Sequence, residues 1–69
     1  MEYLVVIEKA ENNYSGYLPD LPGCVATGDT LEEVMDAIQK AVQMHLQGMR
    51  EDGLAIPLPS ARADYLQAV

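Results

Sequence analysis

One long amphipathic segment constrains the fold of this chain more than any other feature. Thr30-Leu31-Glu32-Glu33 has the form of a capping box, with Glu33 placed to reach back to the backbone amide of Thr30. Beyond it, apolar residues recur at steps of three and four, which predicts a helix with one buried stripe. Gly53 is placed to end this helix in a left-handed conformation. The rest of the fold must therefore be built around one helix.

Three short segments before the helix have the composition of strands. Residues 3–7 are a continuous β-branched and aromatic run, typical of a strand that is buried on both faces and internal in its sheet. Residues 14–18 follow a turn at residues 12–13 and predict a hairpin with the first strand. Residues 19–23 hold two prolines and a glycine that permits positive φ, so they predict an irregular loop. A short third strand is expected at residues 24–27.

A fourth strand is expected at residues 65–69, after a proline-stiffened connector at residues 56–59. The predicted fold class is α+β with the order β-β-β-α-β, in one domain that spans residues 1–69. Three antiparallel strands carry one long helix on one face, and a right-handed crossover makes the short C-terminal strand parallel to the first. The expected spatial order is 3-2-1-4, which leaves the first strand internal.

The chain is short enough that its stability as a monomer is marginal. With 69 residues it buries about 60% of its unfolded surface, so hydrophobic gain and conformational entropy nearly cancel. Cys24 is the only cysteine, which excludes an internal disulfide, and a single histidine, His45, makes a structural zinc site improbable. We therefore expect a homodimer or higher oligomer that forms through residues 65–69 or through the helix stripe.

The net charge argues against nucleic acid and anionic membranes as partners, and the first residues argue against secretion. Eleven acidic residues face four basic ones, for a net charge of −7, so no direct binding to nucleic acid or to an anionic membrane is expected. An acidic domain suits a basic protein partner. The first residues lack the basic region of a signal peptide, and no apolar run is long enough to span a membrane. Together with a lone thiol, this predicts a cytoplasmic protein.

The sequence offers little for catalysis. His45 lies on the apolar stripe of the helix, and Cys24 has the apolar neighbours of a small buried residue. Asp20, Asp29 and Glu33 could bind a metal ion, but turn geometry explains the two aspartates and the capping box explains Glu33. We therefore expect no catalytic residue, no cofactor site and no metal site.

Binding to another protein is the stronger expectation. An aromatic, proline and aliphatic stretch surrounds the rigid loop, and such groups anchor interfaces at little entropic cost. An acidic edge at the start of the helix is expected beside that loop. The predicted partner-binding residues supply apolar anchors or negative charge, and they are Tyr17, Asp20, Leu21, Pro22, Glu32, Glu33 and Asp36.

The order of the loop motifs resembles the HicB-like antitoxin family. The resemblance lies in Tyr17-Leu18-Pro19-Asp20-Leu21-Pro22-Gly23-Cys24, followed by Thr27-Gly28-Asp29-Thr30 and by Glu33. Gly53 and Ile56-Pro57-Leu58-Pro59-Ser60 are also similar to the way that family leaves its helix. The resemblance covers about Tyr3 to Ser60, and Val34 departs from the alanine that many members carry.

This resemblance implies a partial RNase H-like fold and an antitoxin. Such an antitoxin binds and occludes HicA, a small basic toxin that cleaves mRNA, and it needs no cofactor. The family also implies dimers or higher assemblies. Its full-length members usually add a C-terminal helix-turn-helix or ribbon-helix-helix module that binds the operator, and this chain is expected to be a stand-alone domain without one.

Two alternatives remain open at this point. One is an oligomeric interaction or regulatory module that has no toxin. The other is a remnant RNase H-like nuclease that uses a metal ion held by Asp20, Asp29 or Glu33. Against the nuclease stands the first strand, because residues 3–7 carry no carboxylate where RNase H-like enzymes place a metal ligand.

Overall fold

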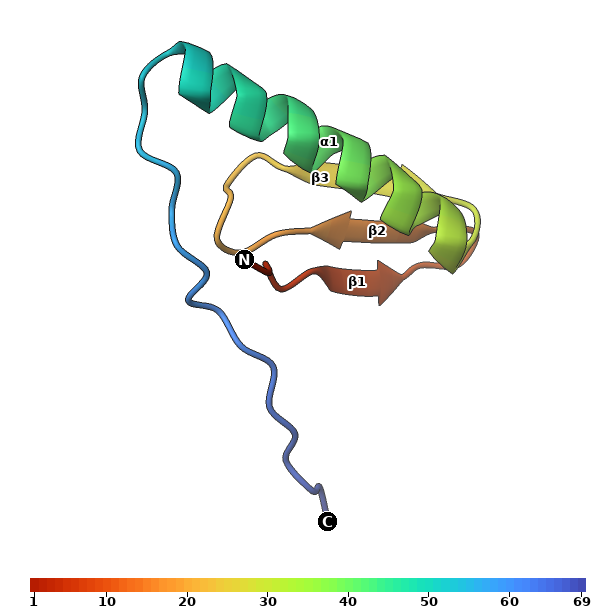
Figure 1. Cartoon of the computed structure of the whole chain (residues 1–69). Helices are drawn as coiled ribbons and strands as arrows, with labels where there is room; N and C mark the ends of the chain where they lie inside the picture. The colour runs from red at the N-terminus through yellow and green to blue at the C-terminus, as the bar shows by residue number, and fades with distance from the viewer.

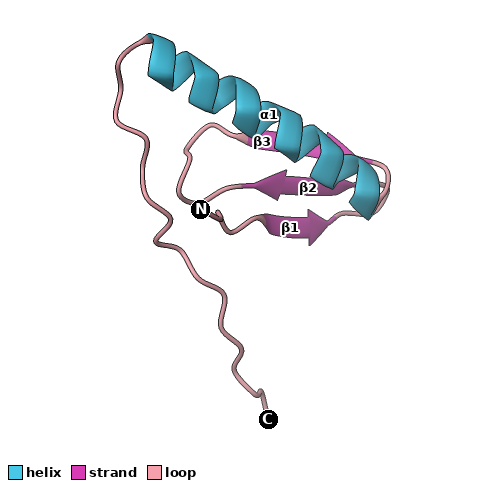
Figure 2. Ribbon diagram, in the orientation of Figure 1, coloured by secondary structure: helices cyan, strands magenta, loops and turns pink.

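The computed structural model describes all 69 residues and has two layers. Strands β1 (Val6–Lys9), β2 (Tyr14–Tyr17) and β3 (Val25–Gly28) form an antiparallel sheet in the order β1-β2-β3. Helix α1 (Leu31–Glu51) crosses one face of this sheet (Figure 1), and everything after it is loop (Figure 2). The α+β class, the three antiparallel strands and the single long helix are confirmed.

Both ends of α1 form as their local sequence predicts. The Oγ1 of Thr30 accepts a hydrogen bond from the amide of Glu33 at 3.1 Å. The Glu33 carboxylate reaches one residue further back than predicted and accepts from the amide of Asp29 at 2.9 Å. At the other end, Gly53 has φ of +69°, and its amide donates to the carbonyl of Arg50.

The core lies between α1 and the half of the sheet nearest to it. Its five buried side chains are Leu18, Leu21, Cys24, Val34 and Ile38. The burial expected for Cys24 is confirmed, and desolvation raises the pKa of its thiol.

Glycine lets the helix approach the sheet closely at β2. A Cβ on Gly16 would lie 3.3 Å from Cγ1 of Ile38, so this glycine faces the helix. Because side chains alternate along a strand, Tyr17 points to the opposite, uncovered face of the sheet.

The expected fourth strand at residues 65–69 is not shown in the single chain, and the expected internal position of the first strand is wrong. Residues 54–69 form no strand, and β1 is an edge strand rather than an internal one. The strand also begins at Val6 and not at Tyr3, because its pairing partner β2 ends at Tyr17 and the chain there turns into the proline loop. The predicted order is correct only for the three strands that form.

The segment after the helix follows a path that the sequence does not indicate. One hydrogen bond holds it against the N-terminal segment at Pro57, whose carbonyl accepts from the Tyr3 hydroxyl at 2.6 Å. From Arg62 onward the chain is extended and runs away from the domain (Figure 1). The side chains that a fourth strand would bury are therefore left without cover in the single chain.

Candidate functional site

The predicted partner-binding residues lie at two opposite ends of the sheet. Tyr17 pairs with Val25, which follows the proline loop, whereas Tyr14 pairs with Gly28, which precedes the helix. Strand β3 therefore separates the loop from the start of α1 by its full length (Figure 1). The acidic edge at the start of α1 does not lie beside the proline loop, contrary to the expectation.

The proline loop exposes less apolar surface than its sequence suggests. Leu21, taken as an apolar anchor, is only 1% exposed and belongs to the core. It is held by a tight turn in which its amide donates to the carbonyl of Leu18 and its carbonyl accepts from the amide of Cys24. Tyr17, at 40% exposed, and Pro22 remain on the surface at this end.

Asp20 fastens the segment after the helix to the loop. One carboxylate oxygen accepts from the Ser60 hydroxyl at 2.8 Å, and the other accepts from the Ser60 amide at 3.1 Å. Both oxygens also lie 3.2 Å from the amide of Ala61. The hydrogen bonds from the hydroxyl and amide of Ser60 lower the pKa of this carboxyl, desolvation opposes them, and the hydrogen bond from the Ala61 amide lowers the pKa by the smallest contribution. The Asp20 charge is thus engaged inside the chain.

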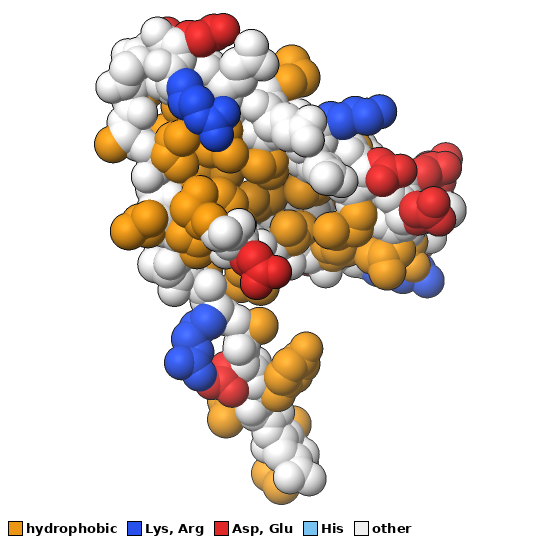
Figure 3. Space-filling model, in the orientation of Figure 1, with side chains coloured by type: hydrophobic (Ala, Val, Ile, Leu, Met, Phe, Trp, Pro, Cys, Tyr) orange, Lys and Arg blue, Asp and Glu red, His pale blue; other side chains and the backbone are white.

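The start of α1 carries exposed carboxylates that form no ion pair within the chain. Glu32 and Asp36 are exposed and form no ion pair, since the one ion pair of the chain joins Arg62 to Asp64 at 3.3 Å. Glu33 is engaged in the helix cap. Figure 3 shows acidic side chains gathered over this end of the helix. The uncompensated charge attracts basic groups most strongly at low ionic strength.

An apolar groove that the sequence did not reveal runs between α1 and the N-terminal segment. It is open to solvent and has a volume of about 500 Å³, and Glu2 and Asp36 are its two charged residues. It exists because the backbone of α1 lies over β2 and β3 rather than over β1, so one side of the helix stripe has no strand beneath it. Its apolar lining consists of Met1, Tyr3, Val5, Leu18, Met35, Ile38 and Val42.

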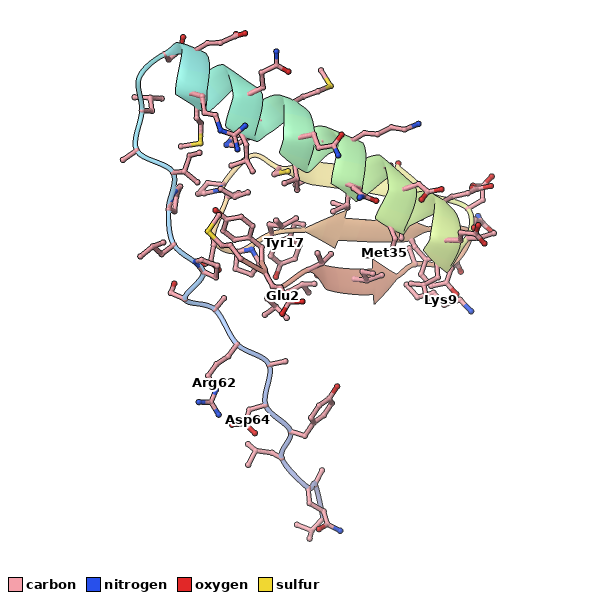
Figure 4. The ribbon with its side chains drawn as sticks, in the orientation of Figure 1. Glu2, Lys9, Tyr17, Met35, Arg62 and Asp64 are labelled. Atoms are coloured by element: carbon pink, nitrogen blue, oxygen red, sulfur yellow. The ribbon has the colours of Figure 1, made fainter.

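The groove opens on the face that Figures 3 and 4 display. Figure 3 shows hydrophobic side chains gathered between the helix and the edge of the sheet. Figure 4 shows Met35 reaching down from α1 on this face and Glu2 beside the N-terminal segment. The sequence held one signal for this groove. The apolar stripe of the helix is wide, and a three-stranded sheet does not cover all of its positions.

The sheet face away from α1 is also uncovered. Tyr17 pairs with Val6 on one side and with Val25 on the other, which places three apolar side chains in a row across the sheet. A shallow hollow of about 490 Å³ lies over β2 and β3 on this face, where Ser15 and Thr27 flank the row. This open face adds a second apolar surface near the proline loop.

The titratable residues do not converge on a metal-binding geometry. No three His, Cys, Asp or Glu side chains group in a way that could hold a metal ion. Asp20 lies at the loop end of the sheet, whereas Asp29 and Glu33 lie at the helix end, so these three carboxylates share no site. Helix α1 does not combine the length and the apolarity that a crossing of a membrane requires.

Comparison with known proteins gives consistent matches along almost the whole chain. Residues 3–69 match the family model described as the HicB_like antitoxin of bacterial toxin-antitoxin system. The chain is 38% identical over 66 residues to an uncharacterized 14.9 kDa protein of Haemophilus phage HP1, covering 96% of this chain and 50% of the phage protein. It is 33% identical over 64 residues to Antitoxin HicB 2 of Photorhabdus laumondii, covering 93% of this chain and 46% of that protein.

A solved structure has the same fold. A chain of the HicA3 and HicB3 toxin-antitoxin complex superposes with a TM-score of 0.72 and 27% sequence identity, covering 86% of this chain and 70% of the other. The chain spans about half the length of the phage protein and of Antitoxin HicB 2.

Proposed function

The chain belongs to the HicB-like antitoxin family of bacterial toxin-antitoxin systems, and on this premise we propose that it binds and occludes a small basic mRNA-cleaving toxin of the HicA type. The similarity to a chain of a HicA3 and HicB3 complex supports a toxin as the partner. Occlusion does not require the antitoxin to catalyse a reaction. It requires only a surface that competes with RNA for the toxin.

The observation that carries the proposal is the pair of exposed carboxylates, Glu32 and Asp36, neither of which forms an ion pair within the chain. A protein that grips mRNA presents basic groups to phosphates. Carboxylates on an acidic domain of net charge −7 attract the same groups, guide the encounter and cover the RNA-binding surface.

The other proposed contact residues divide by their place in the structure. Tyr17 and Pro22 are exposed at the loop end and can contact a partner directly. The other three already have contacts inside the chain: Leu21 packs in the core, Asp20 accepts hydrogen bonds from Ser60, and Glu33 caps α1. These three would support the binding surface without belonging to it.

We further propose that the protein self-associates and acts in the cytoplasm, where its toxin would meet mRNA. A marginal core of five buried residues favours additional burial between copies. A free buried thiol at Cys24 suits a reducing compartment.

The test begins with the adjacent reading frame, where a small basic protein is expected, and then titrates the 69-residue protein with that product at low and high salt. The double variant Glu32→Gln and Asp36→Asn should weaken binding roughly tenfold at low salt and flatten its salt dependence. A matched control, Glu51→Gln and Asp52→Asn, removes the same charge at the far end of α1 and should leave affinity nearly unchanged.

Equal losses in the two double variants would contradict a site at the start of α1. Absence of binding at every salt concentration would instead favour an interaction module without a toxin. Exchanging Tyr17 for serine, separately from the carboxylates, then reports whether the toxin also covers the loop end of the sheet.

A further inference from the structure

The edge of the sheet at β1 is open beside the apolar groove. Strand β1 pairs with β2 alone, so one side of Val6–Lys9 has no strand partner. Its free backbone groups are a template for another extended segment. Next to this edge, Tyr3 and Val5 face the groove under Met35. An added strand here would satisfy the backbone and cover apolar side chains in one step.

The chain itself contains an extended apolar segment that nothing covers. We call residues 62–69 the arm. Tyr65 is 93% exposed and Leu66 is 99% exposed. The side-chain hydrogen bonds of the arm are local, from Arg62 to Asp64 and from the Tyr65 amide to Asp64. Figure 4 shows Arg62 and Asp64 well clear of the sheet and the helix.

The residue pattern of the arm suits a strand with two apolar faces. Alternation would place Leu66 and Ala68 on one side, and Tyr65 and Val69 on the other. The β1 edge offers two apolar surfaces to match: the groove on the helix side, and the row that begins at Val6 on the open face.

We propose that residues 65–69 of one copy form a fourth strand against the β1 edge of a second copy and fill its groove, and that the exchange is reciprocal. This inference rests on the proposed self-association and names the segment that would carry it. Reciprocal exchange of one element gives a closed twofold dimer, in which both edges and both grooves are covered.

The direction in which the arm leaves the domain argues for a second copy. Tyr3 holds Pro57, and Asp20 holds Ser60 and Ala61, so the chain is fixed beside its own N-terminal segment just before the arm begins. From there the arm runs away from its own sheet (Figure 1). Eight extended residues span about 26 Å at about 3.3 Å per residue, which is enough to reach a neighbouring domain.

The first experiment measures the mass of the 69-residue protein by sedimentation equilibrium without toxin. A dimer is expected. Leu66→Asp should weaken it about a hundredfold or more, because a symmetric dimer loses that burial twice. A chain ending at Asp64 should be monomeric. Leu58→Asp is the matched control, since Leu58 is 78% exposed and lies outside the arm. Helical circular dichroism checks that each variant is folded.

The second experiment asks which copy receives the arm, and it leaves the apolar side chains of the arm in place. One population carries Glu8→Cys at the β1 edge and the other carries Gln67→Cys in the arm, both with Cys24→Ala. A short bismaleimide should join the two populations after mixing. In the control, Asp52→Cys replaces the Glu8 variant. Asp52 lies at the far end of α1, so the bismaleimide should not join it to the arm of another copy.

Each contrary result overturns a distinct statement. A monomer at all concentrations, or one that assembles only when toxin is added, overturns self-association together with the arm exchange. A dimer that survives loss of the arm, or that shows no cross-link in the mixture, overturns the exchange alone. A cross-link at monomer mass, in a chain that carries both cysteines, would mean that the arm covers its own β1.

Discussion

The carboxylate of Asp20 accepts hydrogen bonds from both the hydroxyl and the backbone amide of Ser60, which lies 40 residues further along the chain. Asp20 belongs to the loop between β2 and β3, and Ser60 lies between the helix and the arm. This contact joins the two irregular segments of the fold and sets where the arm leaves the domain.

Removing the Asp20 charge should free the segment that it holds. Asp20→Asn keeps the size of the side chain but offers a single, uncharged acceptor oxygen. We expect the amides of Ser60 and Ala61 to lose protection from hydrogen exchange, and protease to cleave residues 57–64 faster. Ser60→Ala, which removes only the hydroxyl donor, should have a smaller effect. Unchanged protection in both variants would contradict the role given to Asp20.

The same contact should persist well into acid. Hydrogen bonds from Ser60 lower the pKa of Asp20 from its ordinary value of 3.8, so the folded state holds the proton more weakly than the unfolded state. Its stabilising effect is therefore present above the unfolded pKa and is lost as pH falls through the lower, folded pKa. An NMR titration of the Ser60 and Ala61 amides should have its midpoint below 3.8. In Asp20→Asn this transition should disappear, and a midpoint at or above 3.8 would show that the contact does not form in solution.

Two glycines should respond oppositely to alanine. A Cβ on Gly28 would lie 2.6 Å from the backbone nitrogen of Val34, so Gly28→Ala must shift the start of α1 and should lower the free energy of unfolding by about 2 kcal/mol. Gly48 lies inside α1 with nothing within 4 Å of an added Cβ. Gly48→Ala should therefore stabilise the protein by up to about 1 kcal/mol. Urea unfolding of both variants measures these changes, and a stable Gly28→Ala protein would refute the close approach.

Cys24 should be a slow nucleophile in the folded protein. Its side chain is 3% exposed, and burial raises the pKa of its thiol, so little thiolate exists at neutral pH. Labelling by a thiol-specific disulfide reagent should be slow in buffer and fast in urea. Labelling at the same rate in both conditions would mean that the thiol is not packed between the proline loop and the helix.

Local sequence signals determined the parts of this fold that depend on neighbouring residues. Thr30, Glu33 and Gly53 mark the ends of α1 because capping groups act within one turn of the helix. The positive φ of Gly23 is likewise a local consequence of loop chemistry, and the apolar neighbours of Cys24 indicated that it would be buried. The loop motifs were also enough to indicate the family.

Tertiary structure decided whatever depends on distant partners. Nothing near Asp20 in sequence points to Ser60, and only packing under α1 places Leu21 in the core. The apolar run at residues 3–7 indicated that both faces of that segment need cover, but not that β1 would be an edge strand in the single chain. Strand pairing depends on two segments, so the sequence of β1 alone does not show whether a partner lies beside it. Hydrogen bonds to Tyr3 and Asp20 fix the chain just before the arm, and the arm then runs away from the β1 edge.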